Sequence, residues 1–248
     1  MSRVAMIAYT HYLSDPRVRR EAEALAARGH EVEFFCLRRS GESPWQELAG
    51  VRIRRLPVSR YRGWKSALYI ASYLHFFFVA FFAISFAHLR RPFDLVHSNN
   101  MPDFMAFAGI VPRLSGRPLI HDIHDTMPEI YQGKFGVDSQ HPLIRLLKLQ
   151  ERMAGRLATR VLTSEHTKRE ALIEHGLPAD KIEVLLNLPD PAIFPMVSAA
   201  ENAQLAGDEF RLVFHGTLAE RLGVDIAMEA VAILGDRIPN LLLDVIGD

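Results

Sequence analysis

The stretch PLIHDIHDTMPE, residues Pro118–Glu129, shows where this chain changes from buried to polar. Its apolar pair Leu119 and Ile120 is followed within a few residues by two histidines and two aspartates, and then by Pro128. This pattern predicts a buried strand that ends in a polar loop. In open α/β sheets, ligands bind at the carboxyl ends of the strands, because the sheet holds the loops there still. The stretch therefore indicates a ligand site at the edge of a parallel sheet.

The alternation of side chains along a strand divides this cluster in two. His121, Ile123 and Asp125 are predicted on one face, and Asp122 and His124 on the other. One alternative is that the two histidines are loop residues with structural partners. Another is a metal site, but Asp-x-His is a weak ligand pattern without a further Cys or His at fixed spacing, so we predict no metal.

Strand and helix patterns alternate on both sides of this stretch. Strands are predicted at residues 4–9, 31–37, 51–56, 94–97, 119–123, 160–163 and 182–186, and helices at 17–28, 104–114, 142–157 and 166–175. This order is typical of an α/β fold, in which helices cover both faces of a parallel sheet.

The character of the chain changes after the last of these strands. Three prolines among small and polar residues indicate a linker, so we predict a first domain at residues 1–190, a linker at 191–209 and a second domain at 210–248. The second domain has strands at 211–214 and 241–246 and a helix at 224–234. About forty residues are too few to close a core, and we therefore expect this domain to be incomplete.

Composition bears on the partners and the cellular compartment of the protein. The 248 residues are 49% hydrophobic, with 29 basic and 29 acidic residues, so the total charge gives no reason to expect nucleic acid as a partner. The single cysteine, Cys36, cannot form an intrachain disulfide, which fits a reducing compartment. We see no signal-peptide pattern and predict a cytoplasmic protein.

The first predicted helix begins with three arginines. Each positive charge in a first turn opposes the helix dipole by about 0.3 to 1 kcal/mol. Arg17 could pair with Glu21, and Arg19 with Glu23, at a spacing of four residues. Arg20 has no such partner, and a helix N-terminus beside a strand end suits an anion. We therefore consider anion binding by this helix beside a purely surface role.

The segment of residues 66–87 contains no charged side chain. As a helix it could span a hydrocarbon core of about 30 Å. It connects two strands of one predicted sheet, however, and a crossing would separate them, so we predict that it does not cross. It is either fully buried, or its outer face meets lipid, a partner or another segment. We expect the protein to sit peripherally on an anionic membrane surface. The cations that would favour this flank the segment: Arg60, Arg62 and Lys65 before it, and His88, Arg90 and Arg91 after it.

Seven motifs occur in the order found in one large family. They are SDPRVRREAEALAARGHEV, FDLVHSNN, HDIHDTMPE, LTSEHTKREAL, KIEVLLNLPD, VFHGTLAERLGVDIAMEAV and PNLLLDVIGD. This succession resembles the family-four retaining glycosyltransferases of the GT-B fold. The resemblance implies two Rossmann-like domains facing across a cleft, the first for the acceptor and the second for the nucleotide sugar. It also implies retention of configuration, usually without a metal, and no cofactor beyond the nucleotide-sugar co-substrate.

The resemblance carries specific residues with it. His124 matches the family's cleft histidine near the reacting sugar, and we predict it as the catalytic residue. The predicted acceptor-binding residues are Arg17, Arg20, Asp125 and Glu129. Gly216 matches the glycine whose backbone approaches the donor phosphates. Where the family usually has an arginine after this glycine, this chain has Thr217, and where it has a lysine five residues further, this chain has Leu222. Arg221, just before Leu222, is placed to supply the missing charge. The predicted donor-phosphate residues are Gly216, Thr217 and Arg221.

Other catalytic patterns do not occur. The chain contains no GxGxxG after the first strand, no P-loop, no HExxH and no GxSxG, which argues against a common dehydrogenase, NTPase or hydrolase. We predict a glycosyltransferase that moves a sugar from a nucleotide sugar to a saccharide or lipid-linked acceptor, in cell-surface polysaccharide or glycolipid synthesis. The alternatives are a sugar-nucleotide epimerase of the same fold and a non-catalytic acceptor-binding or membrane-docking module. The family's paired glutamates would lie beyond Asp248, so we expect no turnover by these 248 residues alone.

Overall fold

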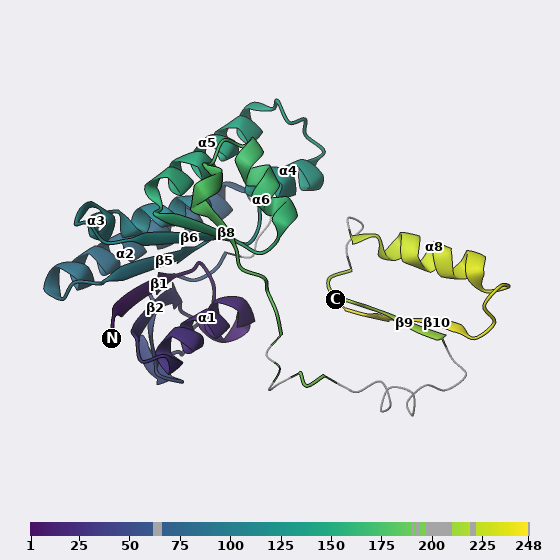
Figure 1. Ribbon diagram of the computed structural model, residues 1–248, viewed down its shortest axis with the longest axis horizontal. Coiled ribbons are helices and arrows are strands. Elements are labelled where there is room, and N and C mark those ends of the chain that lie inside the picture. Colours follow the sequence, from purple (N-terminus) through teal and green to yellow (C-terminus); the bar gives the residue numbers. More distant parts are fainter. Residues whose placement is uncertain (62–65, 190, 192–193, 197–209, 219–221, 248) are drawn as a thin grey trace. The chain divides into compact units, whose positions relative to one another are not determined.

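The computed structural model describes residues 1–61, 66–189, 191, 194–196, 210–218 and 222–247 (Figure 1). The chain divides into two compact units, Met1–Asn187 and Leu188–Asp248, and each is described by itself. Most of the predicted linker, residues 197–209, lies outside the described residues. The predicted boundaries at 190 and 210 therefore stay predictions.

The first unit is built on one sheet of eight strands in the order β3-β4-β2-β1-β5-β6-β7-β8. The strands are β1 (Arg3–Ile7), β2 (Glu31–Leu37), β3 (Trp45–Leu48), β4 (Val51–Leu56), β5 (Leu95–Asn99), β6 (Leu119–Ile123), β7 (Arg160–Thr163) and β8 (Ile182–Val184). All neighbouring pairs are parallel except β3 with β4. The predicted α/β fold with a parallel sheet is confirmed.

The helices lie on the two faces of this sheet (Figure 1). They are α1 (Pro16–Ala27), α2 (Ser66–Arg90), α3 (Ile110–Leu114), α4 (Met127–Phe135), α5 (Pro142–Leu157) and α6 (His166–Glu174), with short 3-10 turns η1 (Tyr12–Ser14), η2 (Asp103–Gly109) and η3 (Ala179–Lys181). Alternate residues of β1 enter different cores: Met6 packs with Val18 of α1, whereas Ile7 belongs to the core that contains Phe76 of α2. The sheet therefore has an α1 face and an α2 face.

Strand β3 was not predicted. It is a four-residue edge strand with mostly exposed side chains, so it lacks the apolar alternation that identifies a half-buried strand. The turn that joins it to β4 has Ala49 at φ 49° and Gly50 at φ 76°. Two positive φ values suit a two-residue hairpin, whose twist matches that of the flanking strands.

The helix predicted at residues 104–114 is wrong in its first half, which forms η2. Gly109 is pressed onto the sheet, since a Cβ there would lie 2.5 Å from Leu119 Cδ1 and 2.8 Å from Val96 Cγ1. Pro112 has no N–H to extend an α-helical ladder backward. Together they leave tight turns followed by a short helix.

Helix α4 was also missed, because the sequence from His121 onward was interpreted as strand and loop. Pro128 lies in the first turn of α4, a position where its missing N–H costs nothing. Gly136 ends the helix in the left-handed conformation at φ 61°. The polar loop between β6 and α4 is therefore only a few residues long.

The second unit contains a two-stranded parallel sheet. Strand β9 (Phe210–His215) pairs with β10 (Leu241–Ile246), and helix α8 (Val224–Leu234) connects them. This is the predicted strand-helix-strand unit, with boundaries that agree within one residue.

Candidate functional site

The candidate site lies at the carboxyl ends of β5 and β6. The two strands pair in parallel with Asn99 opposite Asp122, so the residues that follow them, Asn100 and His124, reach the same edge of the sheet. His124 is only 4% exposed. The predicted gathering of polar side chains at this edge is therefore present, and it is largely enclosed within the first unit.

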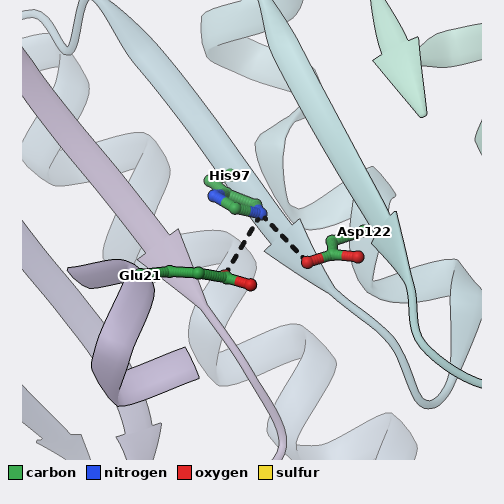
Figure 2. A group of neighbouring side chains, drawn as sticks. All are labelled: Glu21, His97 and Asp122. Atoms are coloured by element: carbon green, nitrogen blue, oxygen red, sulfur yellow. Dashed lines mark ion pairs between the residues drawn. The ribbon is translucent and has the colours of Figure 1, made fainter. Parts of the chain in front are cut away.

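Three side chains from three elements converge on the α1 face (Figure 2). His97 Nε2 of β5 lies 3.6 Å from Asp122 Oδ2 of β6 and 3.8 Å from Glu21 Oε2 of α1. Asp122 Oδ2 is also 3.1 Å from His124 Nε2. The distances from His97 exceed hydrogen-bond length, so they are close polar contacts and not hydrogen bonds. Asp122 is the hub of the cluster.

Burial and pairing shift the pKa values of the carboxyl groups of Asp122 and Glu21 in opposite directions. Burial by itself raises the pKa of Asp122, but its contacts with His124 and His97 outweigh burial and hold this pKa well below its usual value. For Glu21, burial dominates and raises the pKa to about 7, with a lowering effect from His97 and a raising one from Asp122. Asp122 is thus ionised at neutral pH, while Glu21 holds its proton to a much higher pH than an ordinary glutamate does.

The same three residues are the group that could hold a metal among the described residues. Glu21, His97 and Asp122 each offer one donor atom, and these atoms lie within 4.8 Å of one another. Three protein ligands of this kind would suit a divalent cation with an open position. The expectation that the site holds no metal stays a prediction.

Asn100 connects the two strand ends. Its Oδ1 accepts a hydrogen bond of 3.0 Å from the backbone N–H of His124. Its Nδ2 donates to the carbonyl of Asp125 at 2.6 Å and to Asp103 Oδ1 at 3.0 Å. Sequence reasoning missed Asn100, although the paired asparagines at the end of a predicted strand were a usable signal. This side chain sets the backbone position of His124.

His121 takes the structural role that was the alternative for both histidines. It lies on the α2 face, where its Nε2 is 3.6 Å from Asp103 Oδ1 and its Nδ1 is 3.3 Å from the carbonyl of Ser98. His121 and Asp103 are both fully buried. The predicted separation of His121 from Asp122 and His124 is confirmed.

The arginines of α1 are paired differently from the expectation. Arg17 contacts Asp15, with Nε 3.2 Å from Oδ1, and not Glu21, because Glu21 turns inward to His97. Arg20, which has no acidic residue four positions further along α1, donates instead to Asn187 Oδ1 at 3.4 Å. The predicted pair of Arg19 with Glu23 is confirmed, at 2.6 Å.

The other two predicted acceptor residues differ in their surroundings. The side chain of Asp125 is 44% exposed, and its Oδ1 lies 3.8 Å from Lys168 Nζ. Glu129 points to His175, with Oε1 3.0 Å from Nε2. On its other side, His175 Nδ1 lies 2.7 Å from Oε1 of the fully buried Glu151. Glu129 therefore joins α4 to the end of α6 and to α5.

This histidine between two carboxylates has a shifted pKa. Burial lowers it, but the hydrogen bonds with Glu129 and Glu151 outweigh burial and raise the pKa of His175 to about 9. The pKa of Glu129 is lowered, because its bond to His175 outweighs burial, whereas in Glu151 burial dominates and raises the pKa. A positive His175 thus stabilises the packing of α4, α5 and α6 at neutral pH.

We expect His175→Gln to reduce stability in a pH-dependent way. A folded-state pKa above the unfolded value of 6.5 means that the stabilisation is complete below that pH and is lost as the pH rises through 9. After discounting for the part-exposed Glu129, the loss near pH 6 is about 2 kcal/mol. Urea unfolding between pH 6 and 9.5 measures it. His166→Gln, an exposed position on the same helix, is the control; a difference for His175→Gln that stays constant over this range contradicts the assignment.

The predicted phosphate residues belong to the second unit. Gly216 follows β9 directly and has φ 142°, a backbone conformation that residues with a Cβ rarely adopt. Its N–H donates to the carbonyl of Ile246 at 3.0 Å. Thr217 is exposed beside it, and Arg221 lies outside the described residues.

Comparison with known proteins places this geometry in a family. Residues 14–187 match the family described as "Glycosyl transferase 4-like domain". A curated relative, D-inositol 3-phosphate glycosyltransferase of Kineococcus radiotolerans, is 28% identical over 230 residues, which are 85% of this chain and 49% of the relative. The chain thus spans about half the length of the curated relatives that it matches.

Solved structures agree with this at the level of the fold. Sucrose-phosphate synthase from Thermosynechococcus elongatus superposes with a TM-score of 0.73 at 17% identity, over 100% of this chain and 62% of that protein. Anabaena HepE in complex with UDP and glucose gives 0.62 at 14% identity, with the same coverage. The match over residues 14–187 includes the whole cluster around Asp122, and the chain therefore belongs to the glycosyl transferase 4-like family, with a mixed α/β architecture of the GT-B type.

Proposed function

We propose that the protein transfers a sugar from a nucleotide-sugar donor to a saccharide or lipid-linked acceptor, with retention of configuration. In this proposal, the first unit receives the acceptor and the second begins the donor-binding domain. The family match across residues 14–187 carries the proposal, because it includes Glu21, His97, Asp122 and His124. The solved structure of HepE with UDP and glucose supports a nucleotide-sugar donor. Cell-surface polysaccharide or glycolipid synthesis in the cytoplasm is the proposed setting.

His124 is the proposed catalytic residue. Such a transfer requires stabilisation of a departing diphosphate and a positioned acceptor hydroxyl, and it needs no dedicated protein nucleophile. The ionised carboxylate of Asp122, 3.1 Å from Nε2, orients the imidazole, while Asn100 holds its backbone. The ring would act on the reacting sugar through hydrogen bonding in the transition state. A pair of glycosidase carboxylates does not fit, because Glu129 is directed to His175.

The proposed binding residues surround this histidine and the start of the second unit. Arg17, Arg20, Asp125 and Glu129 would contact the acceptor, with the part-exposed side chain of Asp125 the best placed to accept a hydrogen bond from a sugar hydroxyl. Gly216 and Thr217 would approach the donor phosphates through backbone N–H groups, and Arg221 would add positive charge. The φ of Gly216 supports a close approach of backbone to ligand.

A donor panel tests the proposed function. Full-length protein is incubated with UDP-, GDP- and ADP-sugars and a set of saccharide and polyprenyl-phosphate acceptors. We expect release of nucleoside diphosphate that depends on acceptor, with a product whose anomeric configuration by NMR equals that of the donor. An inverted product contradicts retention. Interconversion of the donor sugar without any acceptor favours the epimerase alternative, and binding without turnover favours the acceptor-binding module.

A further inference from the structure

Helix α2, which lies against the sheet (Figure 1), carries a row of large apolar side chains that are exposed. Phe78, Phe82 and Phe86 are 53%, 66% and 52% exposed, and Leu89 continues the row at 74%. Steps of three or four residues keep these positions on one side of a helix. Isolated exposed apolar residues are ordinary on a protein surface, but an aromatic row along a 25-residue helix marks an interaction site.

The opposite side of α2 is buried in the hydrophobic core. Phe76, Ala80 and Ile84 are completely buried in the core beneath the sheet. Among the described residues, Leu68–Arg90 is the one helix that is long and apolar enough to cross a membrane, yet only 22% of its apolar window is buried. The alternative that this segment is fully buried is therefore wrong. The apolar side chains of its outer half do not contribute to the core of the first unit.

The charge around this row has a single sign. Between residues 60 and 93 the chain has three Lys and Arg before the helix, one in its last turn and one directly after it, five in total, with no Asp or Glu, although the whole chain is balanced at 29 and 29. The guanidinium of Arg90 lies 4.0 Å from the ring centroid of Phe86, at the end of the row. Arg60 is exposed before the helix, and Arg62 and Lys65 lie outside the described residues.

Two of the residues predicted to contact lipid head groups, His88 and Arg91, interact with other residues of the protein. His88 is 5% exposed, its Nδ1 accepts from the N–H of Phe93, and burial together with Arg117 and Arg3 lowers its pKa, so it is neutral. Arg91 Nη2 is paired with Glu31 at 2.6 Å. The expectation that these residues bind head groups was wrong for His88, and the attraction rests more on the aromatic row than on charge.

We propose that the outward row of α2, Phe78, Phe82, Phe86 and Leu89, docks the protein on the surface of an anionic lipid bilayer, with the helix in the plane of the membrane. Aromatic side chains enter the boundary between head groups and acyl chains, and Arg90 extends from the end of the row to lipid phosphates. This surface is independent of the proposed transfer activity.

The fold and the charge favour this occupant over two others. A crossing is opposed by topology, because β4 before α2 and β5 after it belong to the same sheet, separated only by β2 and β1. A second copy of the chain would bring two segments that contain cations and no acids against each other. An anionic bilayer complements both the apolar row and its positive ends.

Vesicle flotation tests the proposal. The whole chain is floated with phosphatidylcholine vesicles and with vesicles that contain about 30% phosphatidylglycerol. We expect binding to the anionic vesicles that higher salt weakens but does not abolish. Phe78→Ser with Phe82→Ser should weaken binding at least about tenfold, because two part-exposed rings no longer enter the bilayer. Circular dichroism and thermal unfolding of this double variant should match those of the parent.

A matched double variant locates the surface. Leu146→Ser with Leu149→Ser changes two exposed leucines of α5, which also lie beside basic residues, and should bind like the parent. No flotation of the parent with anionic vesicles overturns the proposal. An equal loss in both double variants overturns the assignment to α2, and so does a parent dimer that only Phe78→Ser with Phe82→Ser dissociates in the absence of lipid. Resistance to extraction at alkaline pH would indicate a crossing and would also overturn it.

Discussion

Replacing His124 with alanine is expected to lower kcat for sugar transfer by about 10² or more in the full-length protein, with the fold intact. The reason is that Asp122 Oδ2 lies 3.1 Å from Nε2 of the imidazole and Asn100 bonds the backbone of His124, so the residue is fixed at the carboxyl end of β6, where ligands bind in such sheets. A group that acts in the transition state affects kcat more than KM. Initial rates over a range of donor and acceptor concentrations separate the two.

The control for this variant is His30→Ala. His30 lies between α1 and β2, at the amino edge of the sheet and therefore away from the proposed site, and should leave kcat unchanged. If His124→Ala retains the parent's kcat and KM, the catalytic assignment is wrong, and the buried imidazole is a partner of Asp122 with a structural role. A rise in KM alone would instead make His124 a binding residue.

The second large effect is expected from Asn100→Ala. This change removes four hydrogen bonds at once, one with His124, one with Asp103 and two with Asp125, and leaves the fully buried carboxylate of Asp103 without its amide partner. Unsatisfied buried polar groups cost more than the bonds themselves contribute, so we expect a loss of about 2 to 4 kcal/mol in the free energy of unfolding. Chemical denaturation followed by tryptophan fluorescence or circular dichroism measures this loss.

The neighbouring asparagine provides a matched comparison. Asn99 is also fully buried, but its side chain makes one long bond, 3.4 Å from Nδ2 to the carbonyl of Ile7. Asn99→Ala should therefore cost about 1 kcal/mol. Equal losses for the two variants would show that burial of an amide, and not the connection between the two strand ends, determines the effect.

Some parts of the fold followed from local patterns alone. The apolar runs of β2, β4 and β6 and the amphipathic pattern of α5 were predicted at the residues where they occur, because burial on a sheet face or a helix stripe requires a fixed period. Strand alternation also separated His121 from Asp122 and His124. Missed or misread elements have weak local signals: the exposed edge strand β3 and the segment around Gly109, whose tight turns come from packing against Leu119.

Only part of the candidate site could be predicted from the sequence. His124 and the polar strand end were found because they are adjacent in the chain, and the ordered motifs indicated the family that residues 14–187 match. The partners of these residues could not be found in this way. Glu21 fits a surface pair with Arg17 by its spacing, yet the three-dimensional structure turns it toward His97, which is 76 positions away along the chain.

The sequence by itself determined the alternation of strands and helices, the parallel sheet, the edge at which polar side chains gather and the apolar length of α2, since each depends on residues that are close in the chain. The tertiary structure alone decided which groups meet: Glu21 with His97 and Asp122, Glu129 with His175, Asn100 between two strand ends, and which half of α2 faces outward. The physical reason is that pKa values, ion pairs and exposure depend on distances of a few ångströms between distant segments. Those distances exist only once the sheet has brought β5, β6 and α1 together.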